Sequence, residues 1–473
     1  MQRLKVTGKE IVTSDGTPIK LHGVCVGGWM NMEHFLNGYP GSESRLRSLF
    51  TEYIGMEKTE RFFDLWLEHL FNIKDITFLK KTGLNTIRIP LNYRHFESDM
   101  NPFVYLEKGF KRLDTIVRAC EANGLYVILD LHSVQGWQNG DWHADNSSRH
   151  ALFWNNKHFQ DRFYALWKEI ARRYKDCDAI AGYNIMNEPI SNAAYGRFGS
   201  HLTYQADWDL LNAIYRKTVN EIHSVDADHI IFLEGDYFST MFDGLEAPFT
   251  ENLVYSSHNY IPAMTSGKKY PGFIDDTYWN PEKIRNQFLE TSGFRFAQKH
   301  NVPLWVGEFG GGVVYPSESM HWQFKALDDH LAVFHEFGIH WTLWAYKDIG
   351  GMSVVQSSPH SPFNRIIAPT LEAKRQLNPD FGWLGSFPEP IETALITIEN
   401  EIMKIIPNLE NGANRMFFRQ AAMSTYTGDI LQEVFVKPFL SLSEKEWEEI
   451  FCSFSIENCI VREEMFDIFK KWI

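Results

Sequence analysis

Eight short apolar segments of strand type recur along the chain, and stretches of helical periodicity separate them. The segments lie at residues 21–26, 85–91, 126–132, 182–187, 229–234, 253–260, 303–309 and 341–346. Strands that are apolar throughout and alternate with helices are typical of a parallel sheet covered by helices. Eight regular units favour closure of that sheet over an open doubly wound arrangement. We therefore expect an α/β fold, a (β/α)8 TIM barrel.

The segments before and after these units predict smaller additions to the barrel. Residues 9–21 look like a small N-terminal hairpin with its turn at Asp15-Gly16-Thr17-Pro18. The barrel should close near residue 377, and the chain from about 390 is mostly helical and amphipathic. We expect a barrel domain at residues 1–385 and a helical C-terminal extension at residues 386–473. The extension can pack on the barrel, mediate oligomerisation or cover a site, and the sequence does not choose among these.

The composition excludes several kinds of partner. The 473 residues carry a formal net charge of −14, which would repel a phosphate backbone and an anionic membrane surface. No apolar run reaches the roughly 18 residues of a membrane span, and the N-terminus lacks the apolar core of a secretory signal. The five cysteines are scattered and form no CxxC pair, as expected for reduced thiols. We expect a cytoplasmic protein that binds neither nucleic acid nor membrane.

Two carboxylates stand where apolar strands are expected to end. Glu188 follows the segment 182–187, and Glu308 lies near the end of the segment 303–309. A buried, unpaired carboxylate is costly, so an acid at such a place has partners or a function. An ion pair at the strand end would explain either residue alone. Together, on opposite sides of an eight-stranded ring, they match the two carboxyl groups that glycoside hydrolysis requires.

Six further residues at expected strand ends complete a pattern that resembles glycoside hydrolase family 5. The matching positions, in chain order, are Arg88 in NTIRIP, His132 in ILDLH, Asn187 and Glu188, His258 and Tyr260 in SSHNY, Glu308, and Trp344 in WTLWAY. The resemblance covers roughly residues 20–377 and implies a retaining β-glycosidase, with Glu188 as general acid/base and Glu308 as nucleophile. Hydrolysis by this double displacement requires no metal and no cofactor.

The resemblance implies tasks for the residues around the expected nucleophile. Asn187 would hydrogen-bond the sugar 2-hydroxyl, a contact that strengthens in the transition state. Arg88 would keep Glu308 ionised, because an adjacent positive charge favours the carboxylate. Tyr260 would donate a hydrogen bond to Glu308 and hold its orientation.

Other matching residues would serve the acid and the sugar. His132 and His258 would contact hydroxyls and tune the acid, and Trp344 would offer an apolar face beneath the sugar ring. Glu188 must be protonated to donate to the leaving oxygen. We therefore expect a raised pKa of Glu188 in the free enzyme, favoured by burial and by the negative charge of Glu308.

Two stretches are similar to the exo-β-1,3-glucanase branch of the family. The first is GGWMNME at 27–33, whose terminal acid binds hydroxyls in the innermost subsite of that branch, which implies this role for Glu33. The second is DLHSVQGWQNG at 130–140, which in that branch precedes a Phe-Asp-Asn with a sugar-binding Asn. Ala144-Asp145-Asn146 is similar but displaced by about three residues, and Asn146 is the corresponding candidate. Because Ala144 replaces the aromatic residue, Trp137 or Trp142 would have to supply an aromatic clamp.

We expect a retaining β-glycosidase that acts on β-linked glucosides or oligosaccharides, with exo action like that of a glucan β-1,3-glucosidase. A small β-glycoside or oligosaccharide is then its partner, and the oligomeric state is open. The first alternative is an endo-β-1,4-glucanase or β-mannanase of the same family, which would have an open groove in place of a pocket. The second is a carbohydrate-binding protein without catalysis, which the presence of both glutamates disfavours.

Some residues have a weaker claim to function. A barrel aldolase or isomerase would need a Schiff-base lysine at a strand end, and the nearest candidate is Lys347. The spacing of His132, Asp141 and His143 matches no known metal site, so none is expected there. Glu234 ends the fifth segment and is left without a role. Tyr278 and Trp279 could form a sugar platform or anchor a loop.

Overall fold

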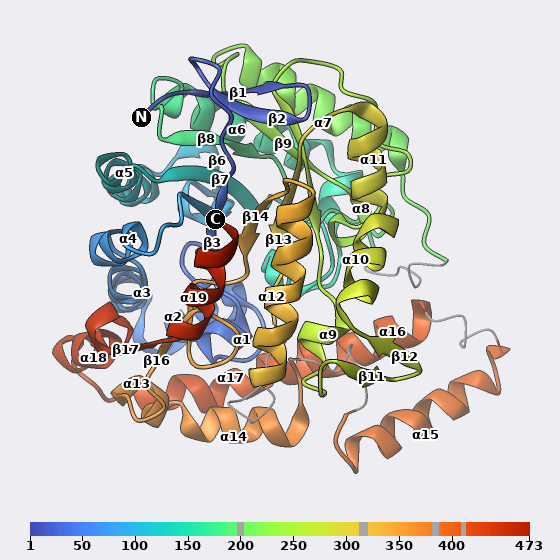
Figure 1. The fold of residues 1–473 in the computed structure, drawn as a ribbon. Coiled ribbons are helices and arrows are strands. Elements are labelled where there is room, and N and C mark those ends of the chain that lie inside the picture. The colour runs from blue at the N-terminus through green and yellow to red at the C-terminus, as the bar shows by residue number, and fades with distance from the viewer. Residues whose placement is uncertain (196–202, 312–319, 381–386, 408–412) are drawn as a thin grey trace.

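A computed structural model describes residues 1–195, 203–311, 320–380, 387–407 and 413–473 (Figure 1). Eight strands form a closed barrel in the spatial order β10-β13-β14-β3-β4-β7-β8-β9. Every neighbouring pair in it is parallel, and each of the eight expected segments supplies one strand, so the predicted TIM barrel is confirmed. The strands are β3 (His22–Cys25), β4 (Thr86–Asn92), β7 (Tyr126–Ser133), β8 (Ile180–Asn184), β9 (Ile230–Glu234), β10 (Leu253–His258), β13 (Leu304–Glu308) and β14 (His340–Leu343).

Amphipathic helices surround the strands and bury one apolar face each. In α6, Phe163, Leu166, Trp167 and Ile170 repeat at helical spacing and are all buried, and the Asn156 side chain caps the helix by accepting from the His158 N–H. The helices before and between the strands are α1 (His34–Asn37), α2 (Glu43–Ile54), α3 (Met56–Leu70), α4 (Ile73–Lys80), α5 (Glu107–Asn123), α6 (Lys157–Tyr174), α7 (Trp208–His223), α8 (Asp236–Ser239), α9 (Pro262–Thr265), α10 (Pro281–Glu290), α11 (Ser292–His300) and α12 (Met320–Glu336). After β14 follow α13 (Pro362–Ile366) and α14 (Ala368–Leu377).

The N-terminal hairpin forms, and a further turn precedes the expected one. β1 (Leu4–Thr7) pairs antiparallel with β2 (Glu10–Thr13), and the turn falls at Gly8, whose φ of +58° suits glycine. The expected turn at residues 15–18 also forms: the Thr13 N–H donates to the Thr17 carbonyl and the Ile19 N–H to the Ile11 carbonyl, both at 2.9 Å, and an antiparallel bridge joins Val12 to Pro18. Leu4 and Ile11 of the hairpin pack with apolar residues inside the barrel, so the hairpin closes the end opposite the strand carboxyl ends.

Long connections gather at the carboxyl ends of the strands. They follow β3, β8, β10 and β14, as the sequence indicates, and the connection after β8 includes residues 196–202, which lie outside the described residues. Small hairpins decorate this end: β5 (Glu97–Ser98) with β6 (Asn101–Tyr105), and β11 (Gly272–Ile274) with β12 (Thr277–Trp279). Within the described residues, no helix has the length and apolar character needed to cross a membrane.

The described part of the C-terminal segment, residues 387–407 and 413–473, packs on the barrel and is mostly helical, with one short strand. Its elements are α15 (Ile391–Met403), α16 (Ala413–Arg419), the π-helix η5 (Gln420–Thr427), α17 (Gly428–Val436), α18 (Glu444–Phe451), β17 (Cys459–Val461) and α19 (Glu463–Trp472). β17 pairs with β16 (Val355–Ser357), which pairs with β15 (Lys347–Asp348), so one small sheet joins this segment to the chain after β14. Figure 1 shows α19 beside α12, and α16 and α17 at the end of the barrel opposite the N-terminal hairpin.

One continuous hydrophobic cluster connects the C-terminal segment with the barrel helices. The ring of Phe451 lies 5.0 Å from that of Phe62 and 5.2 Å from that of Trp66, both on α3. Phe451 is fully buried. The segment therefore contributes to the stability of the barrel as well as covering its surface.

We expect Phe451→Ala to lower the free energy of unfolding by about 3–5 kcal/mol, because it removes a fully buried aromatic ring and leaves a cavity. Chemical denaturation of the full chain measures this. Ile430→Ala in α17 is the matched control: its side chain is 70% exposed, so a change within about 0.5 kcal/mol is expected. Equal, small effects of both substitutions would show that the C-terminal segment unfolds independently of the barrel.

Candidate active site

A pocket of about 830 Å³ opens at the carboxyl ends of the barrel strands. Seven of the ten residues that the sequence singles out line it: Glu33, His132, Glu188, His258, Tyr260, Glu308 and Trp344. Arg88 and Asn187 lie beneath them, fully buried and hydrogen-bonded to the lining residues. The structure thus brings nine of the ten together, and Asn146 lies apart.

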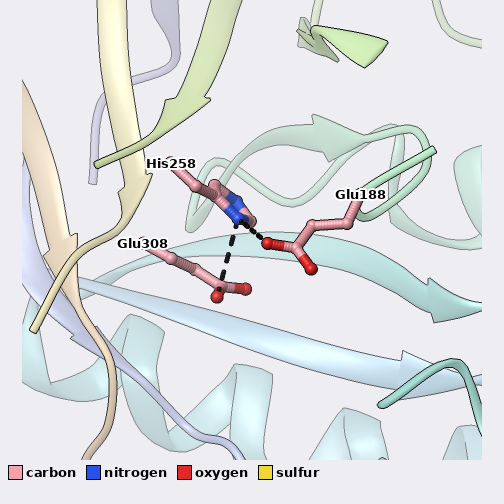
Figure 2. A group of neighbouring side chains, drawn as sticks. All are labelled: Glu188, His258 and Glu308. Atoms are coloured by element: carbon pink, nitrogen blue, oxygen red, sulfur yellow. Dashed lines mark hydrogen bonds and ion pairs between the residues drawn. The ribbon is translucent and has the colours of Figure 1, made fainter. Parts of the chain in front are cut away.

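The two candidate carboxylates face each other across His258. Figure 2 shows the imidazole between them: Nδ1 lies 2.6 Å from Glu188 Oε1 and 3.6 Å from Glu308 Oε2. Oxygen atoms of the two carboxylates and a ring nitrogen of His258 all lie within 4.8 Å of one another. The two carboxylates thus meet on the same histidine at the carboxyl ends of the strands.

Glu308 is held by two donors of different character. Arg88 Nη1 lies 2.5 Å from Oε1, and the Tyr260 hydroxyl donates to Oε2 at 2.9 Å. Arg88 reaches this position from β4 and also donates to Asn187 and Asn184. A guanidinium with a fixed fork of donors holds the carboxylate in one orientation.

Glu188 occupies a strained backbone position that its neighbours stabilise. Its φ is +46°, in the left-handed region that residues other than glycine rarely adopt. The Glu188 N–H donates to Glu234 Oε2 at 2.8 Å, and the Glu188 carbonyl accepts from Asn139 Nδ2 at 2.9 Å. Strain of this kind persists where the surroundings over-determine the backbone, as they do at functional sites.

The expected raised pKa of Glu188 is wrong for the free enzyme. Burial does raise the pKa of Glu188, but hydrogen bonds from His143 and His258 outweigh burial and hold it well below its usual range. Although burial lowers the pKa of His258, the carboxylates of Glu308, Glu234 and Glu188 raise it well above its ordinary value. Glu188 and His258 therefore form one hydrogen-bonded pair, with His258 Nδ1 2.6 Å from Glu188 Oε1.

His143 is the residue near the acid that the sequence reasoning missed. It lies in the 3-10 helix η2 (Trp142–Ala144), and its Nε2 is 3.1 Å from Glu188 Oε2. The two oxygens of Glu188 are thus held by two different histidines. In the sequence, the spacing of His143 raises only the question of a metal ligand, and no strand-end pattern marks it because it comes from the loop after β7.

We expect His143→Gln to move the basic limb of the kcat/KM profile to higher pH. The hydrogen bond from His143 lowers the pKa of Glu188, so its loss raises that pKa and keeps the acid protonated to higher pH. His258, Glu234 and Glu308 still face Glu188 in this variant. Initial rates across the pH range measure the shift, with His360→Gln, an exposed residue outside the pocket, as control. A basic limb that stays in place or moves to lower pH would contradict this role.

Trp344, His132 and Glu33 form the other side of the pocket. The rings of Trp344 and His132 stack with centroids 5.4 Å apart, and His132 Nε2 lies 3.2 Å from Glu33 Oε1. Apart from this contact with His132, Glu33 Oε1 is buried with no hydrogen-bond partner among the described residues, so it can accept from a hydroxyl. Gly27 is required here, because a Cβ at this position would lie 2.8 Å from the Trp344 ring.

Asn146 corrects the expectation drawn from the displaced Ala-Asp-Asn motif. Its amide donates to the carbonyls of Asn139 and His150, and its oxygen accepts from the N–H and hydroxyl of Ser148. All its polar atoms are thus used within its own loop, so it is not available to a sugar. The displacement by about three residues turned the side chain from the pocket into the loop.

The aromatic candidates divide between pocket and packing. Trp142 lines the pocket, whereas Trp137 does not. Trp279 of β12 is buried, and the Tyr278 ring meets that of Phe273 edge-on, so both are packing residues outside the pocket. Lys347 binds Asp75 in a buried ion pair away from the pocket, which excludes it as a Schiff-base lysine.

Two buried acids support the site, and neither was given a role from the sequence. Asp130 Oδ2 lies 2.7 Å from His132 Nδ1 and 3.0 Å from Arg88 Nη2. Glu234 joins Arg88 to the Glu188 backbone. Glu234 shares with Glu188 and Glu308 the signal of an acid at the end of an apolar strand, and that signal could have identified it.

The sequence matches a family model described as "Cellulase (glycosyl hydrolase family 5)" over residues 49–350. A β-xylosidase of Phanerodontia chrysosporium is 34% identical and covers 98% of this chain and 96% of its own length. A probable glucan 1,3-beta-glucosidase A of Emericella nidulans is 25% identical, over 62% of this chain and 68% of its own length. A solved structure entitled as a glycoside hydrolase superposes with a TM-score of 0.51 at 22% identity, over 70% of this chain and 90% of that one, which supports the fold.

The extents of these matches differ in one informative way. The family model ends at residue 350, before the C-terminal segment begins. The match to the β-xylosidase covers nearly the whole chain and so includes most of that segment.

Proposed function

This chain belongs to glycosyl hydrolase family 5, and from that premise we propose that it is a retaining exo-β-glycosidase. Its substrates are short β-linked glucosides or xylosides, from which it removes one terminal sugar at a time. The finding that carries the proposal is the approach of Glu188 and Glu308 oxygens to within 4.8 Å. Retaining enzymes hold their carboxyl groups about 5–5.5 Å apart, whereas inverting enzymes need about 6.5–9.5 Å to admit water.

Glu308 is the nucleophile in the proposed first step. A carboxylate oxygen of Glu308 bonds to C1 of the sugar while the bond between C1 and the leaving oxygen breaks. Before this step, His258, 2.6 Å from Glu188 Oε1, passes a proton to Glu188. Glu188 delivers that proton to the leaving oxygen and is left as the carboxylate. In the second step, water bonds to C1, Glu188 accepts its proton, and the bond between C1 and Glu308 breaks. Two inversions return the β configuration, and the steps need no metal or cofactor.

The surrounding residues divide the remaining tasks. Arg88 and Tyr260 orient Glu308, and Asn187, held by Arg88, hydrogen-bonds the 2-hydroxyl of the sugar. Trp344 provides the apolar face under the ring. Glu33 lines the pocket, and its Oε1 is placed to accept from hydroxyls of the terminal sugar, a contact that supports exo action.

Action on β-xylosides has specific support in the relative that matches the C-terminal segment as well as the barrel. Glucose carries a hydroxymethyl group at C5 that xylose lacks. We expect the shape of the pocket around Glu33 to determine which of the two sugars binds. An endo-β-1,4-glucanase or β-mannanase is a second candidate within the family, and a carbohydrate-binding protein without activity is a candidate outside the enzymes. All five cysteines are free thiols, which supports the cytoplasmic location that we also propose.

The test compares 4-nitrophenyl β-glucoside and β-xyloside as substrates, and then identifies the products from cello- and xylo-oligosaccharides. We expect release of monosaccharide alone from the oligosaccharides, and a β-anomer as the first product in the proton NMR spectrum. A rapid fall in the viscosity of carboxymethyl cellulose would favour endo action. Binding of these sugars without hydrolysis would contradict catalysis.

A further inference from the structure

Three consecutive residues at the pocket rim adopt a backbone conformation that bulky side chains rarely take. Tyr237, Phe238 and Ser239 follow β9 and have φ values of +50°, +56° and +60°. Only glycine enters this region freely, and runs of several residues there are exceptional. A sequence selected for stability alone would place glycine in such a turn, so the aromatic pair needs another explanation.

Neighbouring residues hold the turn in this conformation. The Asp236 carboxylate accepts from the Tyr237 N–H at 2.5 Å and from the Tyr204 hydroxyl at 3.0 Å, and the Ser191 hydroxyl also donates to it. Ser239 Oγ donates to the Ser256 carbonyl of β10 at 2.8 Å. The turn is therefore held by strand β10 and by the connection after β8, and its direction is set.

The turn directs both aromatic side chains to the side of the pocket where the acid lies. Tyr237 and Phe238 line the pocket, and each is half-buried. The Phe238 ring lies 6.1 Å from the ring of His143, whose Nε2 is 3.1 Å from Glu188. Because Glu188 protonates the leaving oxygen in the proposed mechanism, the group that departs lies on this side.

The C-terminal segment covers the same side of the pocket. Met416 of α16 belongs to one apolar cluster with Tyr237, Phe238 and Met241, and it lines the pocket. Gln420, at the start of η5, also lines the pocket and hydrogen-bonds Arg149. Arg149 Nη1 is 3.0 Å from Asp141 on the pocket rim, and Arg149 is only 2% exposed.

We infer that Tyr237 and Phe238, with Met416 of the C-terminal segment, form a leaving-group subsite for a flat group with an apolar face. This inference rests on the proposed function. An aryl ring, or the C–H face of a second sugar, has the required shape and chemistry, because both stack on aromatic faces. The flexible thioether of Met416 adapts to either group from above.

The test compares three substrates with the same sugar: the phenyl glycoside, the methyl glycoside and the β-linked disaccharide. Phe238→Ala and Met416→Ala should each lower kcat/KM for the phenyl glycoside or the disaccharide roughly tenfold, as expected for a lost apolar contact in a binding pocket. The value for the methyl glycoside should change less than about twofold, because its leaving group does not reach the rings. A lower kcat/KM for the phenyl glycoside alone would assign the subsite to aryl groups. A lower kcat/KM for the disaccharide would assign it to a second sugar.

Phe238→Gly separates the function of the ring from its part in folding. It removes the same ring as Phe238→Ala but suits the left-handed backbone, so it should have the higher Tm of the two and the same loss of preference for large leaving groups. Ile430→Ala, on the exposed face of α17, is the control for the C-terminal segment. Equal losses on all three substrates, or no loss on any, would overturn the inference.

A binding measurement keeps this inference distinct from the proposed function. Calorimetry with a phenyl 1-thio-β-glycoside reports occupancy without turnover, and Phe238→Ala should weaken it roughly tenfold, again as one lost apolar contact. If the unsubstituted enzyme hydrolyses no glycoside, the proposed function fails while this readout still tests the subsite. If the enzyme hydrolyses glycosides but the thioglycoside binds equally well to the unsubstituted enzyme and to Phe238→Ala, only the subsite inference is contradicted.

Discussion

We expect Glu308→Gln to lose roughly 10⁴–10⁶-fold in kcat, the scale on which removal of a catalytic nucleophile acts. Glutamine keeps the shape of the side chain but cannot form the bond to C1. Arg88 retains its contacts with Asp130 and Glu234, so the fold should persist with little change in Tm. Hydrolysis of a 4-nitrophenyl glycoside and a thermal melt measure the two properties.

A smaller residue at the same position gives a sharper result. Glu308→Gly opens space beside C1, and azide can then attack from the side that Glu308 occupied, which should give the α-glycosyl azide. Glu336→Gln, an exposed acid paired with Arg285, is the control and should retain full activity. Substantial activity of Glu308→Gln would show that another group attacks C1.

The effect of Glu188→Gln should depend on the leaving group. For a sugar leaving group, which needs a proton, we expect a loss on the order of 10²–10⁴-fold, the usual contribution of general acid catalysis. For a 2,4-dinitrophenyl glycoside, whose phenolate leaves without a proton, the first step should be little affected. Comparing kcat/KM for the two substrates isolates this step.

Azide also distinguishes the role of Glu188 from that of Glu308. With Glu188→Ala and the dinitrophenyl glycoside, azide should replace water on the glycosyl enzyme and give the β-glycosyl azide, the opposite anomer to that from Glu308→Gly. An equal loss for both leaving groups would mean that Glu188 does not act as the acid.

The barrel was predictable because its signal repeats. Eight apolar segments alternate with helices, and each strand is buried on both faces, so the pattern survives small errors in any one element. The N-terminal hairpin was less so, because Gly8 and the Asp15–Gly16 pair are both suitable turn residues, and the structure has a turn at each.

The site was predictable where strands position its residues. Arg88, Asn187, His258 and Glu308 lie in or directly after barrel strands, so their order along the chain fixes their meeting point. Asn146 failed because it depends on a loop, in which a displacement of a few residues redirects a side chain. His143 was missed for the same reason, although it contacts Glu188 directly.

Two properties of the site depend on contacts between distant parts of the chain. The pKa of Glu188 is set by His143 and His258 from two other elements, and burial alone suggested the opposite direction. Met416 and Gln420 reach the pocket from more than 200 residues beyond Glu188 in the chain. Periodicity and composition report neither kind of contact.

The central claim is that Glu308 forms a covalent bond to the sugar. The enzyme is incubated with an activated 2-deoxy-2-fluoro-β-glucoside and, in parallel, with the matching xyloside. The fluorine slows hydrolysis of the bond between the sugar and the enzyme, so the covalent adduct accumulates. Intact mass detects the adduct, and peptide mapping identifies the residue that carries it. The account predicts a gain of one fluorosugar on the peptide that contains Glu308, and no gain in Glu308→Gln. An adduct on another residue, or hydrolysis of the natural substrate to the α-anomer with no adduct, would contradict it.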